Sequence, residues 1–516
     1  MTTDKKVRVR FAPSPTGGLH LGGVRTALFN YLFAKHNNGD FILRIEDTDQ
    51  SRYVPGAEEY IYETLRWCGL QPDESPVHGG EYLPYRQSER RELYRAYAEQ
   101  LVKQGYAYYA FDTPFDLEEM RLKFKTEQNP SPQYDHVHRE KMQNSLTLPA
   151  NEVQRFLQQG VPYVIRIKMP VNEEIKFTDM IRGEVTFNSS QVDDKVLLKA
   201  DGMPTYHLAV VVDDYLMKIT HVFRGEEWLP SAPAHILLWK YLFGLENMPK
   251  WAHLPLILKP DGNGKLSKRD AERLGFPIFA MDWKDPRTNE HTQGFREKGF
   301  LPEAFVNMLA LLGWNDGTEQ EIFSLDELVQ RFSMDHVHKS GAKFNYEKAL
   351  WFNHEWIKKL PVSGFLLPVK ERMKKKGIEI NDDEKLKKVL ELVKDRCTLL
   401  TDFVQQTSFF FKTPETIDTA SIKPKWNEQK QLFFMELIRA FQLMQEWEHD
   451  MLEKEFKEMA ATHQIKPGDL MLPFRIMLVG GKFGPGVFDI AAIIGKDETI
   501  KRIKGGLKIL NKSEEE

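Results

Sequence analysis

FAPSPTGGLHLGG, residues 11–23, is the segment of the sequence that decides the fold. An alternating apolar run, residues 7–11, precedes it, and apolar residues at helical spacing follow it as far as Leu32, which predicts a strand, a tight turn and a helix. The glycines leave the first helical turn unshielded, and its free N–H groups suit a phosphate chain, to which His20 would add a donor. Because ordinary packed α/β turns look similar, a second element is needed.

The second element is KLSKR, residues 265–269, which follows the turn-rich segment 260–264. Alone, this pattern is typical of a solvated basic loop. Together with residues 11–23 it favours a flexible loop that brings cations to bound phosphates.

An acidic cluster follows the next predicted strand. Residues 41–45 form a buried apolar run that ends at Glu46, Asp47 and Asp49. Ligands of open α/β sheets bind at the carboxyl ends of strands, so the cluster, beside the Ser14 turn, predicts a ligand-binding role.

Both elements resemble the signatures of class I aminoacyl-tRNA synthetases, namely a His-x-Gly-His-like turn at residues 20–23 and a Lys-x-Ser-Lys loop at residues 265–268. Further segments are similar, in the same order over nearly the whole chain, to bacterial-type glutamyl-tRNA synthetases. They are APSPTG at 12–17, RIEDTD at 44–49, PTYH at 204–207, VDD at 212–214 and RGEEW at 224–228.

The resemblance implies ATP-dependent attachment of L-glutamate to tRNA(Glu) through a glutamyl-adenylate, with Mg²⁺ on the phosphates. It assigns catalysis to His20, Lys265 and Lys268. The implied ATP-binding residues are Gly17, Gly18, His20, Leu21, Gly22, Gly23, Glu227, Lys265, Leu266, Ser267 and Lys268. The implied glutamate-binding residues are Ser14 and Glu46 for the ammonium group, and Arg10, Tyr206 and Arg224 for the two carboxylates. Which arginine faces which carboxylate stays open.

The implied fold class is α/β: a Rossmann-like nucleotide-binding catalytic domain with an inserted α+β acceptor-binding subdomain, followed by an all-α anticodon-binding half. We expect the catalytic domain at residues 1–105 and 191–260, the insertion at 106–190, the loop and stem-contact region at 261–325, and the helical region at 326–516. Two local expectations are a central strand at 205–212, after a hairpin at Asp201-Gly202, and a helix from Ser88, its N-cap, to Gly105.

Composition limits the class of protein. The chain has 516 residues, 41% hydrophobic and 28% charged, which is typical of a multidomain soluble protein. No apolar segment is long enough to cross a membrane, and the basic start, residues 1–6, has no apolar region behind it, so we expect a cytoplasmic monomer. At a net charge of −4, RNA contacts must use local basic runs, at 370–376, 385–388 and 496–508, although each run is more typical of a solvated helix face.

The sequence departs from part of the family in two places. Many members bind zinc through cysteines where this chain has YAYYAF, residues 106–111, and the insertion has no cysteine. The pairs His136/His138 and His336/His338 lack further ligands, so we predict a zinc-free insertion held by aromatic packing. Residues 271–299 are also longer than the family's usual connection; the pattern favours a surface loop and its role stays open.

Several alternatives remain. The enzyme could be a non-discriminating form that also charges tRNA(Gln), since the anticodon-reading residues cannot be located in the sequence. A paralogue that glutamylates a modified tRNA base would lack the helical half, and small-molecule adenylyltransferases are far shorter. A non-catalytic tRNA-binding module is disfavoured by the intact His20, Glu46, Lys265 and Lys268, and ATP–pyrophosphate exchange would distinguish it.

Overall fold

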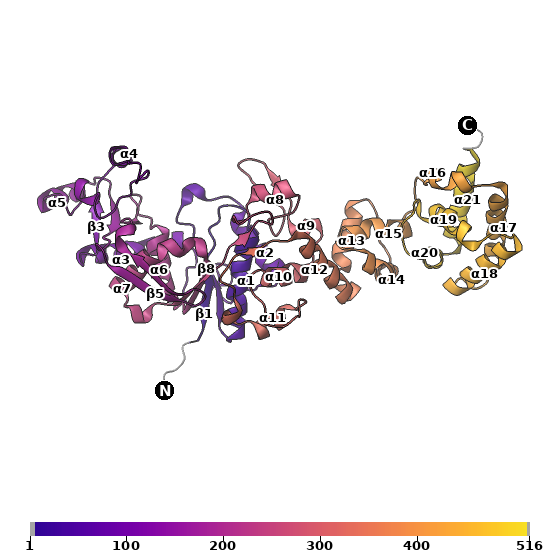
Figure 1. The fold of residues 1–516 in the computed structure, drawn as a ribbon, viewed down its shortest axis with the longest axis horizontal. Helices are drawn as coiled ribbons and strands as arrows, with labels where there is room; N and C mark the ends of the chain where they lie inside the picture. The colour runs from indigo at the N-terminus through magenta and orange to yellow at the C-terminus, as the bar shows by residue number, and fades with distance from the viewer. Residues whose placement is uncertain (1–5, 513–516) are drawn as a thin grey trace. The chain divides into compact units, whose positions relative to one another are not determined.

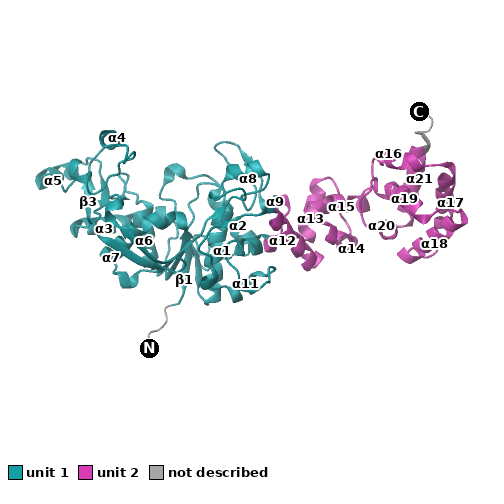
Figure 2. Ribbon diagram, viewed as in Figure 1, with its two compact units in different colours: residues 1–297, 305–346 teal, residues 298–304, 347–516 magenta. Residues whose placement is uncertain are grey.

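The computed structural model describes residues 6–512 and divides into two compact units (Figure 2). Unit 1 comprises the chain up to residue 297 together with residues 305–346. Unit 2 comprises residues 298–304 and the chain from residue 347 onwards. Each unit is described by itself.

Unit 1 is built on parallel strands with helical crossovers (Figure 1). β1 (Arg8–Phe11) and β2 (Asp40–Leu43) are parallel, and α1 (Leu21–His36) connects them. The Thr220 N–H donates to the Arg8 carbonyl at 2.9 Å, which brings the start of β1 next to β8. The other strands of this layer are β5 (Glu174–Asp179), β6 (Gly183–Asn188), β8 (His221–Gly225) and β9 (Lys250–Leu254), in the order β6-β5-β9-β8, with β8 and β9 parallel. The predicted Rossmann-like α/β fold is confirmed.

Helices cover this layer because their apolar faces need burial. Buried side chains from α3, α6 and α7 join those of the strands in one core cluster that includes Tyr94, Leu208 and Trp239. Among the helices that lie wholly or mainly in unit 1 are α2 (Ala57–Trp67), α3 (Arg91–Lys103), α6 (Tyr206–Leu216), α7 (Ala232–Leu242), α8 (Lys268–Leu274), α9 (Phe295–Lys298), α10 (Pro302–Ala310) and α11 (Leu325–Arg331).

Two local expectations are wrong. Residues 205–212 do not form a strand; they form the start of α6. Because α6 is buried on most sides, most of its residues are apolar, and the spacing of apolar residues therefore cannot distinguish a helix from a strand here. Ser88 does not cap α3, which begins at Arg91 after a 3-10 turn; instead the Ser88 hydroxyl donates to Asp47 Oδ2 at 2.6 Å.

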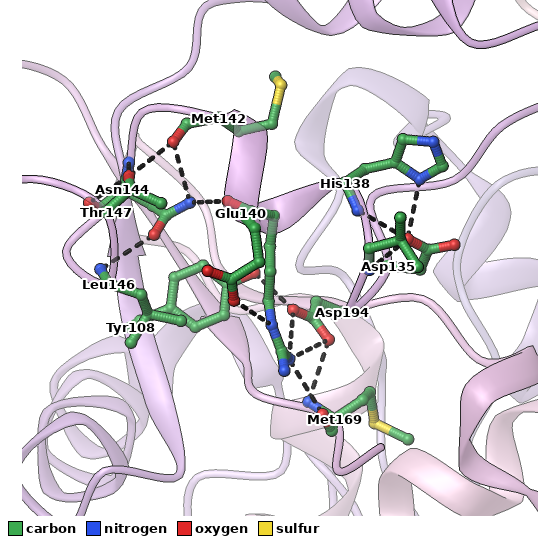
Figure 3. A network of polar contacts seen from close by, with 12 residues as sticks. Tyr108, Asp135, His138, Glu140, Met142, Asn144, Leu146, Thr147, Met169 and Asp194 are labelled. Carbon is green, nitrogen blue, oxygen red and sulfur yellow. Dashed lines mark hydrogen bonds and ion pairs between the residues drawn. The ribbon is translucent and has the colours of Figure 1, made fainter. Parts of the chain in front are cut away.

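The predicted insertion, residues 106–190, contains the antiparallel strands β3 (Ala107–Ala110) and β4 (Val164–Ile167), with α4 (Pro114–Lys123) and α5 (Ala150–Gln158). β4 also pairs with β7 (Val196–Leu198), which lies beyond those bounds, so that the three strands form one sheet. Its buried centre is the carboxylate of Asp194, which Figure 3 shows between Tyr108 and Met169. This carboxylate accepts from the Tyr108 hydroxyl at 2.6 Å, the Met169 N–H at 3.0 Å and Arg139 Nη1 at 3.2 Å. Tyr108 belongs to the segment where many relatives place cysteines, so here a hydrogen-bonded hub ties the strands together.

Unit 2 is helical, and residues 347–512 form no strand. Polar N-caps start several helices; Asp382, for example, accepts from the Lys385 N–H. Two separate helices occupy most of residues 382–411, since α14 ends at Val393, before Cys397, and α15 begins at Asp402. The helices are α12 (Tyr346–Lys359), α13 (Leu366–Lys375), α14 (Asp383–Val393), α15 (Asp402–Phe411), α16 (Thr419–Ile422), α17 (Glu428–Leu443), α18 (His449–Thr462), α19 (Pro467–Val479), α20 (Val487–Ile494) and α21 (Lys496–Lys512).

The helices between residues 6 and 512 include none that combines the length and the apolar character needed to cross a membrane. Cys68 and Cys397 are both buried free thiols.

Candidate active site

A cavity of about 860 Å³ opens at the carboxyl ends of β1, β2 and β8 in unit 1. Every site residue expected from the sequence lines it except Ser267. The structure therefore brings together, from five separate segments, the residues Arg10, Ser14, Gly17, Gly18, His20, Leu21, Gly22, Gly23, Glu46, Tyr206, Arg224, Glu227, Lys265, Leu266 and Lys268. Their individual roles stay predictions.

One wall of the cavity is the N-terminus of α1. His20 is the N-cap residue but makes no side-chain capping bond, and the Leu21 N–H donates to the Ile278 carbonyl at 3.0 Å. The N–H groups of Gly22 and Gly23 have no partner within the helix, because the first turn of a helix leaves its amides unpaired. They offer a seat for an anion at the positive end of the helix dipole.

His20 is exposed to the cavity, although protein surrounds it closely. Burial and the charge of Lys265 lower the pKa of His20 below its ordinary value, while Glu227 opposes the shift. The imidazole is therefore neutral at pH 7, and it would donate a hydrogen bond without a charge. Lys265 Nζ donates to Glu227 Oε1 at 2.6 Å. Burial raises the pKa of Glu227, but its hydrogen bonds and the charge of Lys265 together lower that pKa below its ordinary value.

The second loop lysine meets a residue of the extension 271–299. Lys268 Nζ lies 2.7 Å from Glu290 Oε1 and 3.7 Å from Glu272 Oε1. Ser267, which does not line the cavity, is the N-cap of α8 and forms a capping box with Asp270. Its hydroxyl thus fixes the start of the helix that carries Lys268.

The extension packs directly on residues 17–23. Besides the bond from Leu21 to Ile278, the Ala280 N–H donates to the Leu19 carbonyl at 3.4 Å. A Cβ added to Gly18 would lie 2.9 Å from Trp283 Cγ, so only glycine allows this approach. Trp283 and Asp285 line the cavity. The expectation that the extension favours a plain surface loop is therefore incomplete, since its first half forms part of the cavity wall.

At the other end of the cavity, Arg224 is held by neutral groups. Its Nε donates to His253 Nε2 at 2.9 Å, and its Nη1 contacts the Tyr206 hydroxyl and His235 Nδ1, both at 3.1 Å. Arg224 Nη2 is buried and has no hydrogen-bond partner among the described residues. Arg224 itself lines the cavity, and a guanidinium with one unpaired donor is suited to a ligand carboxylate.

Arg10 is placed differently, because it already has a carboxylate partner. Its Nε and Nη2 donate to Asp214 at 3.0 and 3.3 Å, and Arg44 Nη1 donates to the same carboxylate at 2.8 Å. Arg44 Nη2 also reaches Glu46 at 3.3 Å. Burial raises the pKa of Glu46, although the charges of Arg44 and Arg10 oppose this shift. An ammonium group bound beside Glu46 would favour the ionised form of its carboxylate.

The sequence reasoning did not identify His235 and His253 as part of the site. A single histidine inside an apolar strand or helix carries no pattern that distinguishes a core residue from a ligand-holding one. No group of three or more His, Cys, Asp or Glu side chains suited to a metal ion occurs among residues 6–512. The absence of zinc from the protein in solution stays a prediction.

Comparisons with known proteins agree with this geometry. A family model described as "tRNA synthetases class I (E and Q), catalytic domain" matches residues 6–351, and one described as "Anticodon binding domain" matches residues 351–507. The glutamate–tRNA ligase of Cytophaga hutchinsonii is 50% identical over 512 residues, covering 99% of this chain and 98% of that protein. That of Flavobacterium johnsoniae is 50% identical over 507 residues, covering 98% and 100%.

Solved structures give the same answer. The crystal structure of a glutamate–tRNA ligase from Elizabethkingia meningosepticum, in complex with its amino acid, is 48% identical, covers 98% of this chain and 100% of that one, and has a TM-score of 0.92. The structure from Elizabethkingia anophelis, also 48% identical with the same coverage, has a TM-score of 0.89. The resemblance found in the sequence is thereby confirmed, and the chain belongs to the glutamate–tRNA ligases of the class I aminoacyl-tRNA synthetase family.

Proposed function

We propose that the chain activates L-glutamate with ATP and transfers it to tRNA(Glu), acting as a cytoplasmic monomer. The observation that carries the proposal is one cavity lined both by phosphate-type donors and by Arg224, whose guanidinium has one unpaired donor, Nη2. Glutamate and ATP would meet between them.

In the first step a glutamate carboxylate oxygen attacks the α-phosphorus of ATP and pyrophosphate leaves. In the second, a hydroxyl of the terminal tRNA ribose attacks the anhydride carbonyl and AMP leaves. Neither step needs a protein nucleophile, so catalysis consists of placing the reactants and offsetting the charge on the phosphate oxygens. His20, Lys265 and Lys268, with the free amides of Gly22 and Gly23, are the groups placed to do this.

The residues that line the cavity are compatible with a magnesium ion that binds together with ATP. Mg²⁺ is commonly held by substrate phosphates and one or two carboxylates, and no group of three ligating side chains occurs in the described residues. Glu227, which lines the cavity beside Lys265, is the carboxylate we assign to it. The ion would offset phosphate charge.

Arg224 and Tyr206 would bind one carboxylate of glutamate, and Glu46 with Ser14 the ammonium group. The contrast between the two arginines supports this division. Arg10 is paired with Asp214, whereas the partners of Arg224 are uncharged. Arg224 is therefore the stronger anion site, and Arg10 would act mainly by holding Asp214, whose second partner, Arg44, reaches Glu46.

Unit 2 would bind the anticodon arm. Within the basic runs several lysines are paired, as Lys370 is with Asp383. Others are exposed, and those of α21 share one helix face by their spacing. A face of this kind would contact the RNA backbone, whereas base-specific contacts would come from elsewhere in the unit. The exposed lysines are Lys374, Lys375, Lys376, Lys388, Lys501, Lys504 and Lys508, of which Lys501 also pairs with Glu498 at 3.1 Å.

The experiment is attachment of labelled glutamate to separate tRNA(Glu) and tRNA(Gln) transcripts, with pyrophosphate exchange measured with and without tRNA. Charging of tRNA(Glu) alone supports a discriminating enzyme, and charging of both supports a non-discriminating one. The variant Lys268→Ala should lower the exchange rate by about a hundred- to a thousandfold. Charging of neither transcript would refute the proposal.

A further inference from the structure

Behind Arg224 lies a buried chain of polar groups that has no contact with the cavity. Asp179 and His253 are 1% and 0% exposed, and they come from β5 and β9. His253 Nδ1 lies 2.6 Å from Asp179 Oδ2, and His253 Nε2 accepts from Arg224 Nε at 2.9 Å. Neither residue lines the cavity.

The hydrogen-bond directions in this chain are determined. Arg224 can only donate, so His253 Nε2 must present its lone pair, and the ring proton must therefore lie on Nδ1. Nδ1 then donates to the Asp179 carboxylate. Burial raises the pKa of Asp179, but the hydrogen bonds that this carboxylate accepts lower the pKa by more, so Asp179 stays ionised. Burial, with the charge of Arg224, also lowers the pKa of His253, so the ring stays neutral.

This arrangement places an anion near Arg224 without letting it touch the guanidinium. In the Arg10 pair the Asp214 carboxylate binds the guanidinium directly. In the Arg224 chain an imidazole separates Asp179 from the guanidinium, so the arginine is oriented while its charge stays available to an anion in the cavity. His235, on α7, acts similarly at Nη1, because its Nδ1 can only accept there.

We propose that Asp179 and His253 are positioning residues for glutamate recognition: Asp179 fixes the His253 tautomer, and His253 then fixes the orientation of the Arg224 guanidinium at the cavity, where it would bind the substrate carboxylate. This inference rests on the proposed function of Arg224. It predicts that loss of the chain weakens glutamate binding and leaves ATP binding unchanged.

Two substitutions of similar size separate positioning from packing. Gln can place its amide oxygen where His253 Nε2 lies and so still accept from Arg224, whereas Asn can replace only Nδ1 and leaves Arg224 Nε without an acceptor. In tRNA-dependent pyrophosphate exchange with the full chain, His253→Asn should raise the KM for glutamate by about five- to a hundredfold, the range expected when a buried donor loses its partner. His253→Gln should stay within about threefold of wild type, on the same basis.

A second pair tests the tautomer. Asp179 Oδ1 accepts from the Ile181 and Arg182 N–H groups, so in Asp179→Asn the amide oxygen stays there and the amide N–H replaces Oδ2. This N–H faces His253 Nδ1, which moves the ring proton to Nε2 and sets it against the Arg224 N–H, and the His253 backbone N–H also loses its acceptor. The KM for glutamate should rise as in His253→Asn. Because Gln has no tautomer, combining Asp179→Asn with His253→Gln should recover most of the lost affinity.

The control is His221→Gln, on the same strand as Arg224 but bonded to Thr220; its KM for glutamate should not change. Thermal unfolding of every variant shows whether it folds. Equal effects of Gln and Asn at position 253, an unchanged KM in His253→Asn, or an equal rise in the KM for ATP would each overturn the inference. If Arg224→Ala left the KM for glutamate unchanged, the proposed role of Arg224 would fail instead.

Discussion

Lys268 Nζ lies 2.7 Å from Glu290 Oε1, so a lysine of the signature loop forms an ion pair with the extension that follows it. The other loop lysine, Lys265, pairs with Glu227. ATP phosphates must therefore compete with two carboxylates for the cations that are proposed to bind them.

Removing the charge of Glu290 should make ATP bind more tightly. The side chains of Lys268 and Glu290 are 35% and 55% exposed, and pairs of this kind contribute at most about 1 kcal/mol. We therefore expect Glu290→Gln to lower the KM for ATP by about two- to fivefold in pyrophosphate exchange. Glu272→Gln, at 3.7 Å from Lys268, is the matched control and should act more weakly. A KM equal to that of wild type in Glu290→Gln would show that the pair does not compete with ATP.

The contact between Gly18 and the extension should be sensitive to a single methyl group. In Gly18→Ala the new Cβ would lie 2.9 Å from Trp283 Cγ and 3.3 Å from Phe279 Cδ1, and such overpacking costs about 1–3 kcal/mol. We expect a lower melting temperature and a higher KM for ATP. Adding Trp283→Ala should restore part of the stability, and the absence of any recovery would argue that the strain arises elsewhere.

The insertion should be stable without zinc and sensitive to loss of Asp194. Asp194→Ala removes the buried carboxylate partner of Arg139 and leaves it only the exposed Glu140 at 3.6 Å; breaking a buried ion pair costs about 3–5 kcal/mol. We expect a marked fall in the melting temperature of this variant, while a chelator leaves the wild-type transition unchanged. Stoichiometric zinc in metal analysis of the purified protein would contradict the prediction.

Stability should decrease below about pH 6.5 because unit 1 buries neutral histidines. Burial, with the charges of Lys195 and Lys250 respectively, lowers the pKa of His207 and of His221 from 6.5 to about 4. The unfolded chain therefore binds more protons than the folded one between these values, so the free energy of unfolding falls as the pH falls through this window. Urea denaturation of wild type and His221→Gln at several pH values tests this. The variant should show a shallower decline, and parallel curves would exclude a contribution from His221.

Parts of the fold and site followed from the sequence where the pattern was local. The alternating residues before Phe11 and the helical spacing after Leu21 are sufficient for β1, the turn and α1. The prediction of a strand at residues 205–212 is wrong. Val210, Val211 and Val212 have high strand propensity, yet the segment is a helix buried on most sides. Packing against the core, which no local pattern expresses, decided the outcome.

The sequence predicts the site residues that lie within recognisable motifs, but not the partners of those residues elsewhere in the chain. His20 and Lys265 stand in recognisable segments. The partner of Arg10 is Asp214, 204 residues away, and that of His253 is Asp179, 74 residues away. Pairings over such separations are set by the strand order, so the different electrostatic states of Arg10 and Arg224 emerge only from the folded chain.

The backbone bond from Leu21 to Ile278 has a consequence for the timing of synthesis. The turn that would hold the nucleotide phosphates leaves the ribosome early, but its supporting wall comes more than 250 positions later in the sequence. At about 5–20 residues per second, the ribosome needs roughly 15 to 50 seconds to supply that wall. During this interval the nascent N-terminal segment lacks part of its nucleotide site, so the chain would become competent for ATP only after more than half of it has been translated.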